Sequence, residues 1–257
     1  MGQHWLSDAG ALQAICASAE LSASDTVLEI GPGMGHLTAL LVQRAAKVVA
    51  VEVDADLVNQ LPKQVPATNL HVILQDILSF DLTSLPPYYK IVANIPYYLT
   101  SHLIRLVSES VNPPNLVVIL VQKEVAQRVS AAPGNMSLLS ITAQFYWETS
   151  LGRIIASKLF TPPPKIDSQI LILRRRRSEL FPGIDTKTYF RIVKAGFSGR
   201  RKTLLNSLSG GLRLPKADIT QLLKTSGVDP GNRAQALALG DWYHIYQSAE
   251  KALPRNT

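Results

Sequence analysis

The sequence predicts an α/β protein in which a mostly parallel sheet, covered by helices on both sides, precedes a small all-helical C-terminal domain. Two observations support this prediction. Short apolar runs alternate with helical patterns through the first two-thirds of the chain, an order typical of parallel sheets. Beyond residue 180 helical patterns continue, but no convincing strand pattern follows.

The first domain is expected to span residues 1–180. Its predicted strands are residues 26–30, 48–53, 72–74, 91–93 and 116–121, with residues 153–156 and 168–173 as a closing pair. Its predicted helices are an amphipathic helix around Leu12 and Ile15 and the residues 36–46, 56–61 and 137–146. The run 116–121 is continuous and β-branched, as expected of a strand buried on both faces.

The second domain, residues 181–257, is expected to be basic and helical, with helices at 189–197, 200–208, 216–226 and 235–252. From Arg174 onward the chain has 16 Lys and Arg against 6 Asp and Glu, whereas the preceding 173 residues have 10 against 13. Such asymmetry predicts that the C-terminal region contacts a polyanion such as RNA. The four arginines at 174–177 fit either that role or a solvated linker.

Composition excludes several classes of protein. The chain has 257 residues, of which 46% are hydrophobic and 18% charged, an ordinary globular balance. The longest apolar run near the middle has six residues, far fewer than the roughly 20 that span a bilayer, so no membrane contact is expected. One cysteine and no signal-peptide pattern predict a cytoplasmic protein without an internal disulfide. The scattered histidines predict no metal site.

A glycine-rich turn, Glu29-Ile30-Gly31-Pro32-Gly33-Met34-Gly35, follows the first predicted strand. Glycine lets the backbone turn sharply and approach a ligand closely. The dinucleotide fingerprint G-x-G-x-x-G needs a glycine where this chain has His36, so that fingerprint fails. The pattern E-x-G-x-G-x-G instead resembles the first motif of class I methyltransferases, in which the turn serves the amino-acid part of S-adenosylmethionine. This assigns Gly31 and Gly33 to a cofactor site.

Two acids lie at the ends of the next two strands, Glu52 in the segment that ends the second and Asp76 after the third. Glu52 stands 21 positions after Gly31, where a carboxylate can accept both ribose hydroxyls of an adenosine. Asp76 follows the third strand and is predicted to bond the adenine amino group. The alternatives are a surface acid or helix cap for Glu52 and the cap of a helical turn for Asp76.

The sharpest motif is Asn94-Ile95-Pro96-Tyr97, directly after the fourth strand, where open parallel sheets bind their ligands. The Asn94 side-chain oxygen and the Ile95 carbonyl can each accept one hydrogen from adenine N6 and so favour a nucleophilic geometry at that nitrogen. Pro96 rigidifies the turn and biases Ile95 toward an extended conformation. Tyr97 offers a ring for stacking an extruded base, worth about 1–3 kcal/mol. The alternative is a proline turn with a buried tyrosine.

Six segments together resemble the KsgA family, the small-subunit ribosomal RNA adenine dimethyltransferases, over nearly the whole chain. They are residues 2–6 (GQHWL), 29–33 (EIGPG), 94–97 (NIPY), 122–126 (QKEVA), 160–168 (FTPPPKIDS) and 196–204 (GFSGRRKTL). The last three segments are far more specific than the glycine turn.

The resemblance implies methylation, from S-adenosylmethionine, of N6 in two adjacent adenosines near the 3′ end of small-subunit ribosomal RNA. It implies cofactor contacts at His4, Leu6, Gly31, Glu52, Asp76 and Asn94. Phe160 would stack on the target base opposite Tyr97 or serve only as a core aromatic. The basic residues Arg200, Arg201 and Lys202 are predicted to contact RNA phosphates. The expected partner is the small-subunit RNA or the assembling small subunit, bound by a monomer.

Two rival functions fit parts of the sequence. A large-subunit rRNA methyltransferase of the antibiotic-resistance type looks similar around Asn94, but residues 160–168 and 200–202 favour the small-subunit enzyme. A non-catalytic RNA-binding assembly or transcription factor could retain the same fold. The intact Glu52 and Asn94 argue against such a loss of chemistry.

Overall fold

The structure is a computed structural model that describes residues 4–252. The chain forms two compact units. The first unit comprises Met1–Gln127 and Trp147–Arg176, and the second comprises Arg128–Tyr146 and Arg177–Thr257. Among the described residues, no helix has the length and apolarity needed to cross a membrane.

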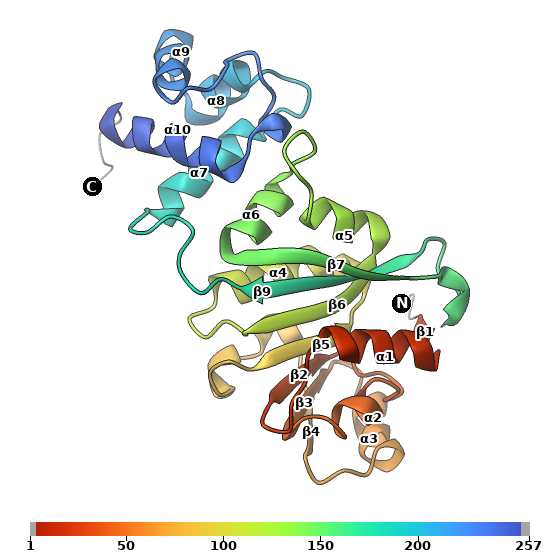
Figure 1. Ribbon diagram of the computed structural model, residues 1–257. Helices are drawn as coiled ribbons and strands as arrows, with labels where there is room; N and C mark the ends of the chain where they lie inside the picture. Colours follow the sequence, from red (N-terminus) through yellow and green to blue (C-terminus); the bar gives the residue numbers. More distant parts are fainter. Residues whose placement is uncertain (1–3, 253–257) are drawn as a thin grey trace. The chain divides into compact units, whose positions relative to one another are not determined.

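The first unit is built on a seven-stranded sheet in the order β4-β3-β2-β5-β6-β9-β7 (Figure 1). The first five strands of this order are parallel, and β9 is antiparallel to both β6 and β7. The strands are β2 (Thr26–Ile30), β3 (Lys47–Glu52), β4 (Leu70–Leu74), β5 (Lys90–Asn94), β6 (Leu116–Gln122), β7 (Trp147–Ile155) and β9 (Ser168–Arg175). The predicted mostly parallel α/β sheet with its closing antiparallel pair is confirmed.

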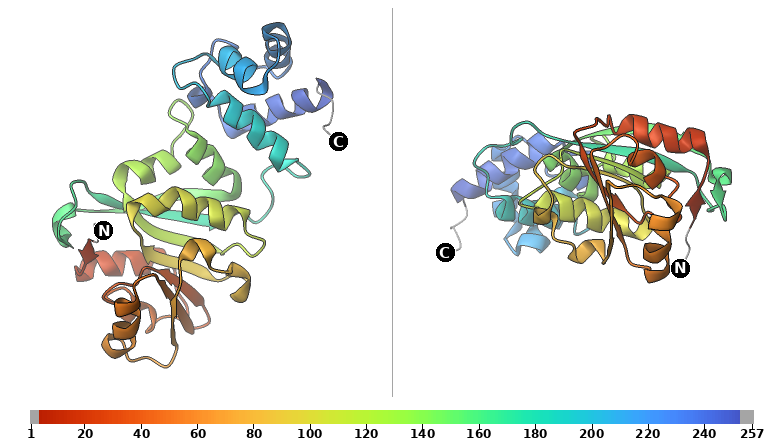
Figure 2. Two further views of the ribbon diagram at one scale, coloured as in Figure 1. Left: turned by 180° about the vertical axis from the view of Figure 1, so that it is seen from behind. Right: turned by 90° about the horizontal axis from the view of Figure 1, so that it is seen from below.

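Helices cover both faces of this sheet. Figures 1 and 2 show α1 (Ala9–Ser18) and α4 (Thr100–Glu109) on opposite sides. On the α1 side, Leu12 and Ile15 pack with Val48 and Leu120 of the sheet, and all four are buried. The unit also contains α2 (Thr38–Leu41), α3 (Ala55–Gln64), α5 (Lys123–Val129) up to Gln127, and the short helices η1 (Ile77–Ser79), η2 (Leu82–Ser84), η3 (Tyr97–Leu99) and η4 (Ser157–Leu159).

The sheet opens between β2 and β5. Strand β2 pairs with β3 along its whole length but with β5 at only two positions, Val27 with Lys90 and Leu28 with Ile91. The connections run outward in opposite directions from this pair, so it is the switch point at which doubly wound sheets bind ligands. The carboxyl ends of β2 and β5 therefore define where a site is expected.

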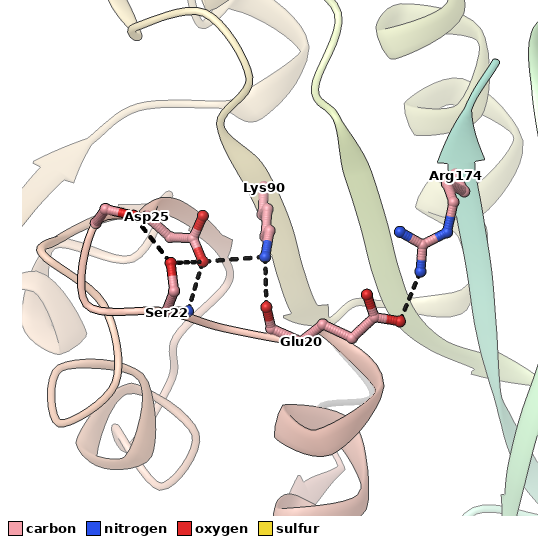
Figure 3. A network of polar contacts seen from close by, with 6 residues as sticks. Glu20, Ser22, Asp25, Lys90 and Arg174 are labelled. Carbon is pink, nitrogen blue, oxygen red and sulfur yellow. Dashed lines mark hydrogen bonds and ion pairs between the residues drawn. The ribbon is translucent and has the colours of Figure 1, made fainter. Parts of the chain in front are cut away.

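The opposite, amino ends of these strands are closed by a network of charges (Figure 3). The Lys90 ammonium lies 3.0 Å from Oδ2 of Asp25 and donates to the Glu20 carbonyl oxygen at 2.6 Å. The same Asp25 oxygen accepts bonds from the backbone and hydroxyl of Ser22, and the Glu20 side chain pairs with Arg174 of β9 at 2.6 Å. Burial alone would raise the pKa of Asp25, but these partners outweigh it and hold the pKa below its usual range.

The second unit is helical and has its own core. Its helices are α6 (Leu138–Tyr146), α7 (Thr186–Gly196), α8 (Leu204–Leu212), α9 (Lys216–Thr225), α10 (Leu239–Ala252) and the short η5 (Ala234–Ala236). Trp242 and Tyr189 are fully buried in this core, and Phe145 of α6 packs against the rings of Tyr189 and Phe190 in tilted and edge-on contacts. The predicted helical C-terminal region is therefore present, and it forms the second unit together with Arg128–Tyr146.

Three boundaries differ from the sequence prediction. The units meet at residues 176 and 177, and Arg128–Tyr146 groups with the second unit because Met136, Ile141 and Phe145 pack in its core. The helix predicted at residues 36–46 is shortened to α2. The glycine turn before it extends to residue 35, and after it the backbone N–H groups of residues 46 and 47 already donate to the Asp25 carbonyl. The helix predicted at 200–208 begins at Leu204, because Thr203 caps it.

Candidate active site

The carboxyl ends of β2, β3 and β5 border a cavity of about 300 Å³ in the first unit. It lies at the switch point described above, where the sheet opens. Nine of the predicted site residues line it together: His4, Leu6, Gly31, Glu52, Asn94, Ile95, Pro96, Tyr97 and Phe160. They come from five segments of the chain that lie together only in the folded protein.

The glycine turn forms one wall of the cavity. Gly31 has a φ of +64°, and a Cβ at this position would meet no atom within 4 Å, so the backbone faces open space. Gly33 has a φ of +57° and serves a different purpose, because a Cβ there would lie 2.1 Å from the Trp5 ring. Gly31 thus leaves room for a ligand, whereas Gly33 makes room for Trp5 and is not among the lining residues.

Glu52, the last residue of β3, lies at the cavity with only 6% of its surface exposed. Its Oε1 accepts bonds from the backbone N–H groups of Val53 and Asp54 at 2.8 and 3.2 Å. Its Oε2 accepts from the Gly33 N–H at 3.3 Å and so links the second strand end to the glycine turn. The carboxylate is therefore held in place at the cavity by backbone donors.

Glu29 is a second acid at the cavity, and the sequence prediction did not assign it a role. It is 1% exposed, and its Oε2 has no hydrogen-bond partner among the described residues. Burial, assisted by the charge of Glu52 and partly offset by the Thr38 hydroxyl, raises the pKa of Glu29 to about 8. A charged residue inside a run of buried apolar strand residues was the available signal.

The turn after β5 is rigid. Pro96 has φ −56° and ψ 136°, and it precedes the short helix η3. The Leu99 N–H donates to the Pro96 carbonyl at 3.0 Å, and the Thr100 hydroxyl donates to the Tyr97 carbonyl at 3.1 Å. Because Asn94 ends β5, paired with Leu120, on one side and these two bonds fix η3 on the other, the backbone of the turn that lines the cavity is held in place.

The Tyr97 ring is held from two sides. Its hydroxyl lies 3.0 Å from the Oγ of Ser168, a fully buried residue of β9. The His4 ring stacks beside it, with centroids 6.5 Å apart and an angle of 25° between the planes. His4 is itself held by Nδ1, which lies 2.6 Å from the Pro162 carbonyl oxygen. The ring therefore has a defined plane next to Asn94.

A two-stranded sheet joins the N-terminal segment to the segment that contains Phe160. Strand β1 (Trp5–Leu6) pairs antiparallel with β8 (Phe160–Thr161), with Leu6 opposite Phe160. Phe160 is 3% exposed, packs in the core cluster of the α1 side, and also lines the cavity. Its surroundings thus match both roles that the sequence left open. Gly2 and Gln3 of the N-terminal motif lie outside the described residues.

Besides Gly33, four predicted site residues do not line the cavity, and three of these four belong to the second unit. Asp76 is exposed and is not among the lining residues, and its Oδ1 caps η1 by accepting from the Leu78 N–H at 2.9 Å. This is the capping alternative, and the ligand role of Asp76 stays a prediction. Arg200, Arg201 and Lys202 are exposed in the turn between α7 and α8 of the second unit, not on a helix.

Comparison with known proteins assigns the fold first. The crystal structure of the 23S rRNA methyltransferase ErmE matches with a TM-score of 0.78 and 28% identity, covering 96% of this chain and 99% of that one. A dimethyladenosine transferase from Plasmodium falciparum matches with a TM-score of 0.81 and 26% identity, covering 96% and 98%. The first unit has the Rossmann-like fold of class I methyltransferases.

Sequence comparison is more specific. The "Ribosomal RNA small subunit methyltransferase A" of Dehalococcoides mccartyi strain BAV1 is 40% identical, covering 94% of this chain and 84% of that protein. The protein of the same name from Desulfitobacterium hafniense strain DCB-2 is 38% identical, covering 98% and 92%. The family profile "Ribosomal RNA adenine dimethylase" matches residues 1–251. The chain belongs to this family, which confirms the resemblance drawn from its motifs.

Proposed function

We propose that this protein transfers methyl groups from S-adenosylmethionine to N6 of two adjacent adenosines in small-subunit ribosomal RNA, giving dimethyladenosine during ribosome assembly. The main support is the position of the rigid Asn94–Tyr97 turn, which borders the same cavity as Gly31 and Glu52. The cavity is therefore lined both by groups suited to hold an adenine amino group and by groups suited to hold an adenosine-containing cofactor.

The residues present fit S-adenosylmethionine. The open space beside Gly31 leaves room for a ligand against the backbone. The orphaned Oε2 of Glu29 is a buried acceptor that a ligand amino group can satisfy, and the fixed Glu52 carboxylate can accept ribose hydroxyls. When bound, the cofactor supplies a methyl group already activated on a sulfonium sulfur. His4, Leu6 and Asn94 complete the proposed contacts.

The chain's own residues then orient the target nitrogen. The Asn94 side-chain oxygen and the Ile95 carbonyl each accept one N6 hydrogen, while the Tyr97 ring fixes the plane of the adenine. Because the methyl donor is already activated, alignment is the main requirement, and no strong base is needed. Each transfer would release a neutral thioether from the donor and one N6 proton to solvent. After the first transfer one N6 hydrogen remains, so one acceptor still orients the nitrogen for the second.

The second unit is proposed to bind RNA. It contains 14 Lys and Arg against 6 Asp and Glu, whereas the first unit has 12 against 13. The exposed turn with Arg200, Arg201 and Lys202 is suited to phosphate contacts. Replacing these three residues with Ala is expected to weaken RNA binding and to flatten its salt dependence by about 0.7–0.9 in slope per lost contact. An unchanged slope and affinity would assign them a structural role.

Sequence identity distinguishes between the two candidate RNA substrates. Relatives named for the small subunit are 38–40% identical to this chain, whereas the 23S methyltransferase ErmE is 28% identical. This difference supports the small-subunit RNA over the large-subunit alternative. The retained Asn94 and Glu52 at one cavity support an enzyme over a non-catalytic binding protein.

The experiment that tests this proposal maps methylated adenosines in ribosomal RNA from cells with and without the gene. Loss of dimethyladenosine at two adjacent positions near the 3′ end of small-subunit RNA is the expected result. Loss of a large-subunit modification would instead establish the rival enzyme. An unchanged methylation pattern, with wild-type gene expression verified, would contradict the proposal.

A further inference from the structure

Tyr98 is an exposed aromatic side chain at the cavity that the proposed chemistry does not use. It lines the cavity next to Tyr97, and 79% of its surface is exposed. Among the described residues its side chain makes no hydrogen bond or ring contact that would explain a structural role, in contrast to Tyr97. A large exposed ring at the rim of a binding cavity is a candidate ligand contact.

The position of Tyr98 is nonetheless fixed. It lies in the middle of η3, between the Pro96 carbonyl that accepts from Leu99 and the Tyr97 carbonyl that accepts from Thr100. Leu99 and Thr100 on its C-terminal side are buried. An exposed ring on an anchored backbone can offer a stacking face at little cost in backbone ordering.

Tyr88 provides an internal comparison. It is 71% exposed and precedes β5, whereas Tyr98 follows the same strand. The two tyrosines therefore differ little in exposure but lie at opposite ends of one strand, and only Tyr98 borders the cavity. Exposure alone does not distinguish them; the distinguishing feature of Tyr98 is its place beside the Asn94 turn.

We infer that Tyr98 is the stacking platform for the nucleotide next to the target adenine on the RNA strand. Tyr97 is half-buried beside Asn94 with its hydroxyl on Ser168, so it suits the base inside the cavity. A nucleotide adjacent to that base stays outside the cavity, and Tyr98 is the exposed tyrosine among the residues that line it. Stacking on an aromatic ring tolerates any base, because every base has a π-face.

This inference rests on the proposed function and assigns Tyr98 to substrate positioning, not to the methyl transfer itself. When two adjacent adenosines are methylated in turn, the platform would hold one while the other occupies the cavity. Removal of the ring should therefore weaken productive binding of RNA and leave cofactor binding unchanged. A base stack of about 1–3 kcal/mol corresponds to roughly a 5- to 150-fold loss in kcat/KM for the RNA substrate.

The test measures methyl transfer to small ribosomal subunits isolated from cells that lack the modification. Tyr98→Ala and Tyr98→Leu should lose about 5- to 150-fold in kcat/KM, whereas Tyr98→Phe, which keeps the ring, should stay within about twofold of the parent. Tyr88→Ala is the matched control and should behave as the parent. Calorimetric titration with S-adenosylmethionine should give the same affinity for all five proteins.

Several results would overturn the inference. Parental kcat/KM for Tyr98→Ala, or equal activity of the Leu and Phe variants, would show that no ring stacking occurs. Weaker binding of S-adenosylmethionine by Tyr98→Ala would place the residue in the cofactor site instead. A parent protein that transfers no methyl to these subunits would refute the proposed function and the inference together, whereas an active parent with an equally active Ala variant refutes the inference alone.

Discussion

The two ends of β2 and β5 differ in how their polar groups are satisfied. At the amino ends, Lys90 and Asp25 form a close pair that Ser22 completes (Figure 3). At the carboxyl ends, one buried oxygen of Glu29 has no hydrogen-bond partner within residues 4–252, and the strands part around a cavity. The same two strands are thus closed by paired charge at one end and left open at the other.

Because of this difference, the amino ends of β2 and β5 are expected to contribute to stability and their carboxyl ends to function. Unsatisfied buried polar groups cost free energy, so their presence at one end points to a ligand that completes them. The paired end has no such deficit and is expected to contribute stability alone. Substitutions at the two ends should therefore change different measurements.

The largest effect is expected from Asn94→Ala at the open end. Loss of the side-chain acceptor should lower kcat about 10³-fold or more and abolish both methyl transfers, not only the second. Melting temperature should change little, because Asn94 ends its strand at the cavity. Activity assays with labelled S-adenosylmethionine, paired with thermal melting, measure both quantities. Retention of the first transfer would contradict the proposed role.

Lys90→Met at the closed end should have the opposite profile. Removing the ammonium leaves the carboxylate of Asp25 without its cation, which should lower the free energy of unfolding by about 3 kcal/mol. Urea unfolding measures this loss, and affinity for S-adenosylmethionine should stay unchanged. Arg174→Met is the matched control, because its pair with Glu20 is exposed and worth only about 0–1 kcal/mol. Equal losses in the two variants would remove the distinction between them.

Glu52→Ala is expected to weaken binding of S-adenosylmethionine by about 1.5–3 kcal/mol, the value of hydrogen bonds to a charged group. Glu52 also accepts from the Gly33 N–H, so Glu52→Gln serves as the variant that retains an acceptor for this turn. Calorimetry should rank the parent tightest and the Ala variant weakest. Unchanged affinity in both variants would refute the ribose assignment.

Glu29 should give the open end its own pH dependence. Its folded-state pKa of about 8 lies above the ordinary value of 4.5, so the folded protein binds a proton that the unfolded chain releases between these values. Stability should therefore fall as pH rises from about 5 to 8, by at most about 1.4 kcal/mol per pH unit, and Glu29→Gln should remove this slope. Thermal melting across that range checks it, and a Glu29→Gln slope equal to that of the parent would contradict it.

Asp25 at the closed end has the opposite sign. Its pKa lies below the ordinary 3.8, so its contribution is present above that value and is lost as pH falls further.

Much of the fold and site followed from local sequence. The strands were predicted from their β-branched apolar runs. Gly31, Glu52 and Asn94, which line the cavity, were predicted because each lies at or directly after the carboxyl end of a strand. The grouping of Arg128–Tyr146 with the second unit was not predicted, because the apolar residues of this segment do not indicate which of the two cores they join.

The burial of Glu29 and the exposure of Tyr98 likewise depend on packing between distant segments. The role of Asp76 cannot be read from the sequence for another reason: an acid at the end of a strand can cap a helical turn as readily as it can bind a ligand.

The cavity at the open end is proposed to be where two methyl groups are transferred to one adenine N6. Mass spectrometry of nucleosides, after unmodified small subunits react to completion with excess S-adenosylmethionine, tests it most directly. N6,N6-dimethyladenosine is the expected product, and it should be absent with Asn94→Ala. Monomethyladenosine as the only product at completion, or no methylated adenosine at all from a folded, cofactor-binding protein, would contradict it.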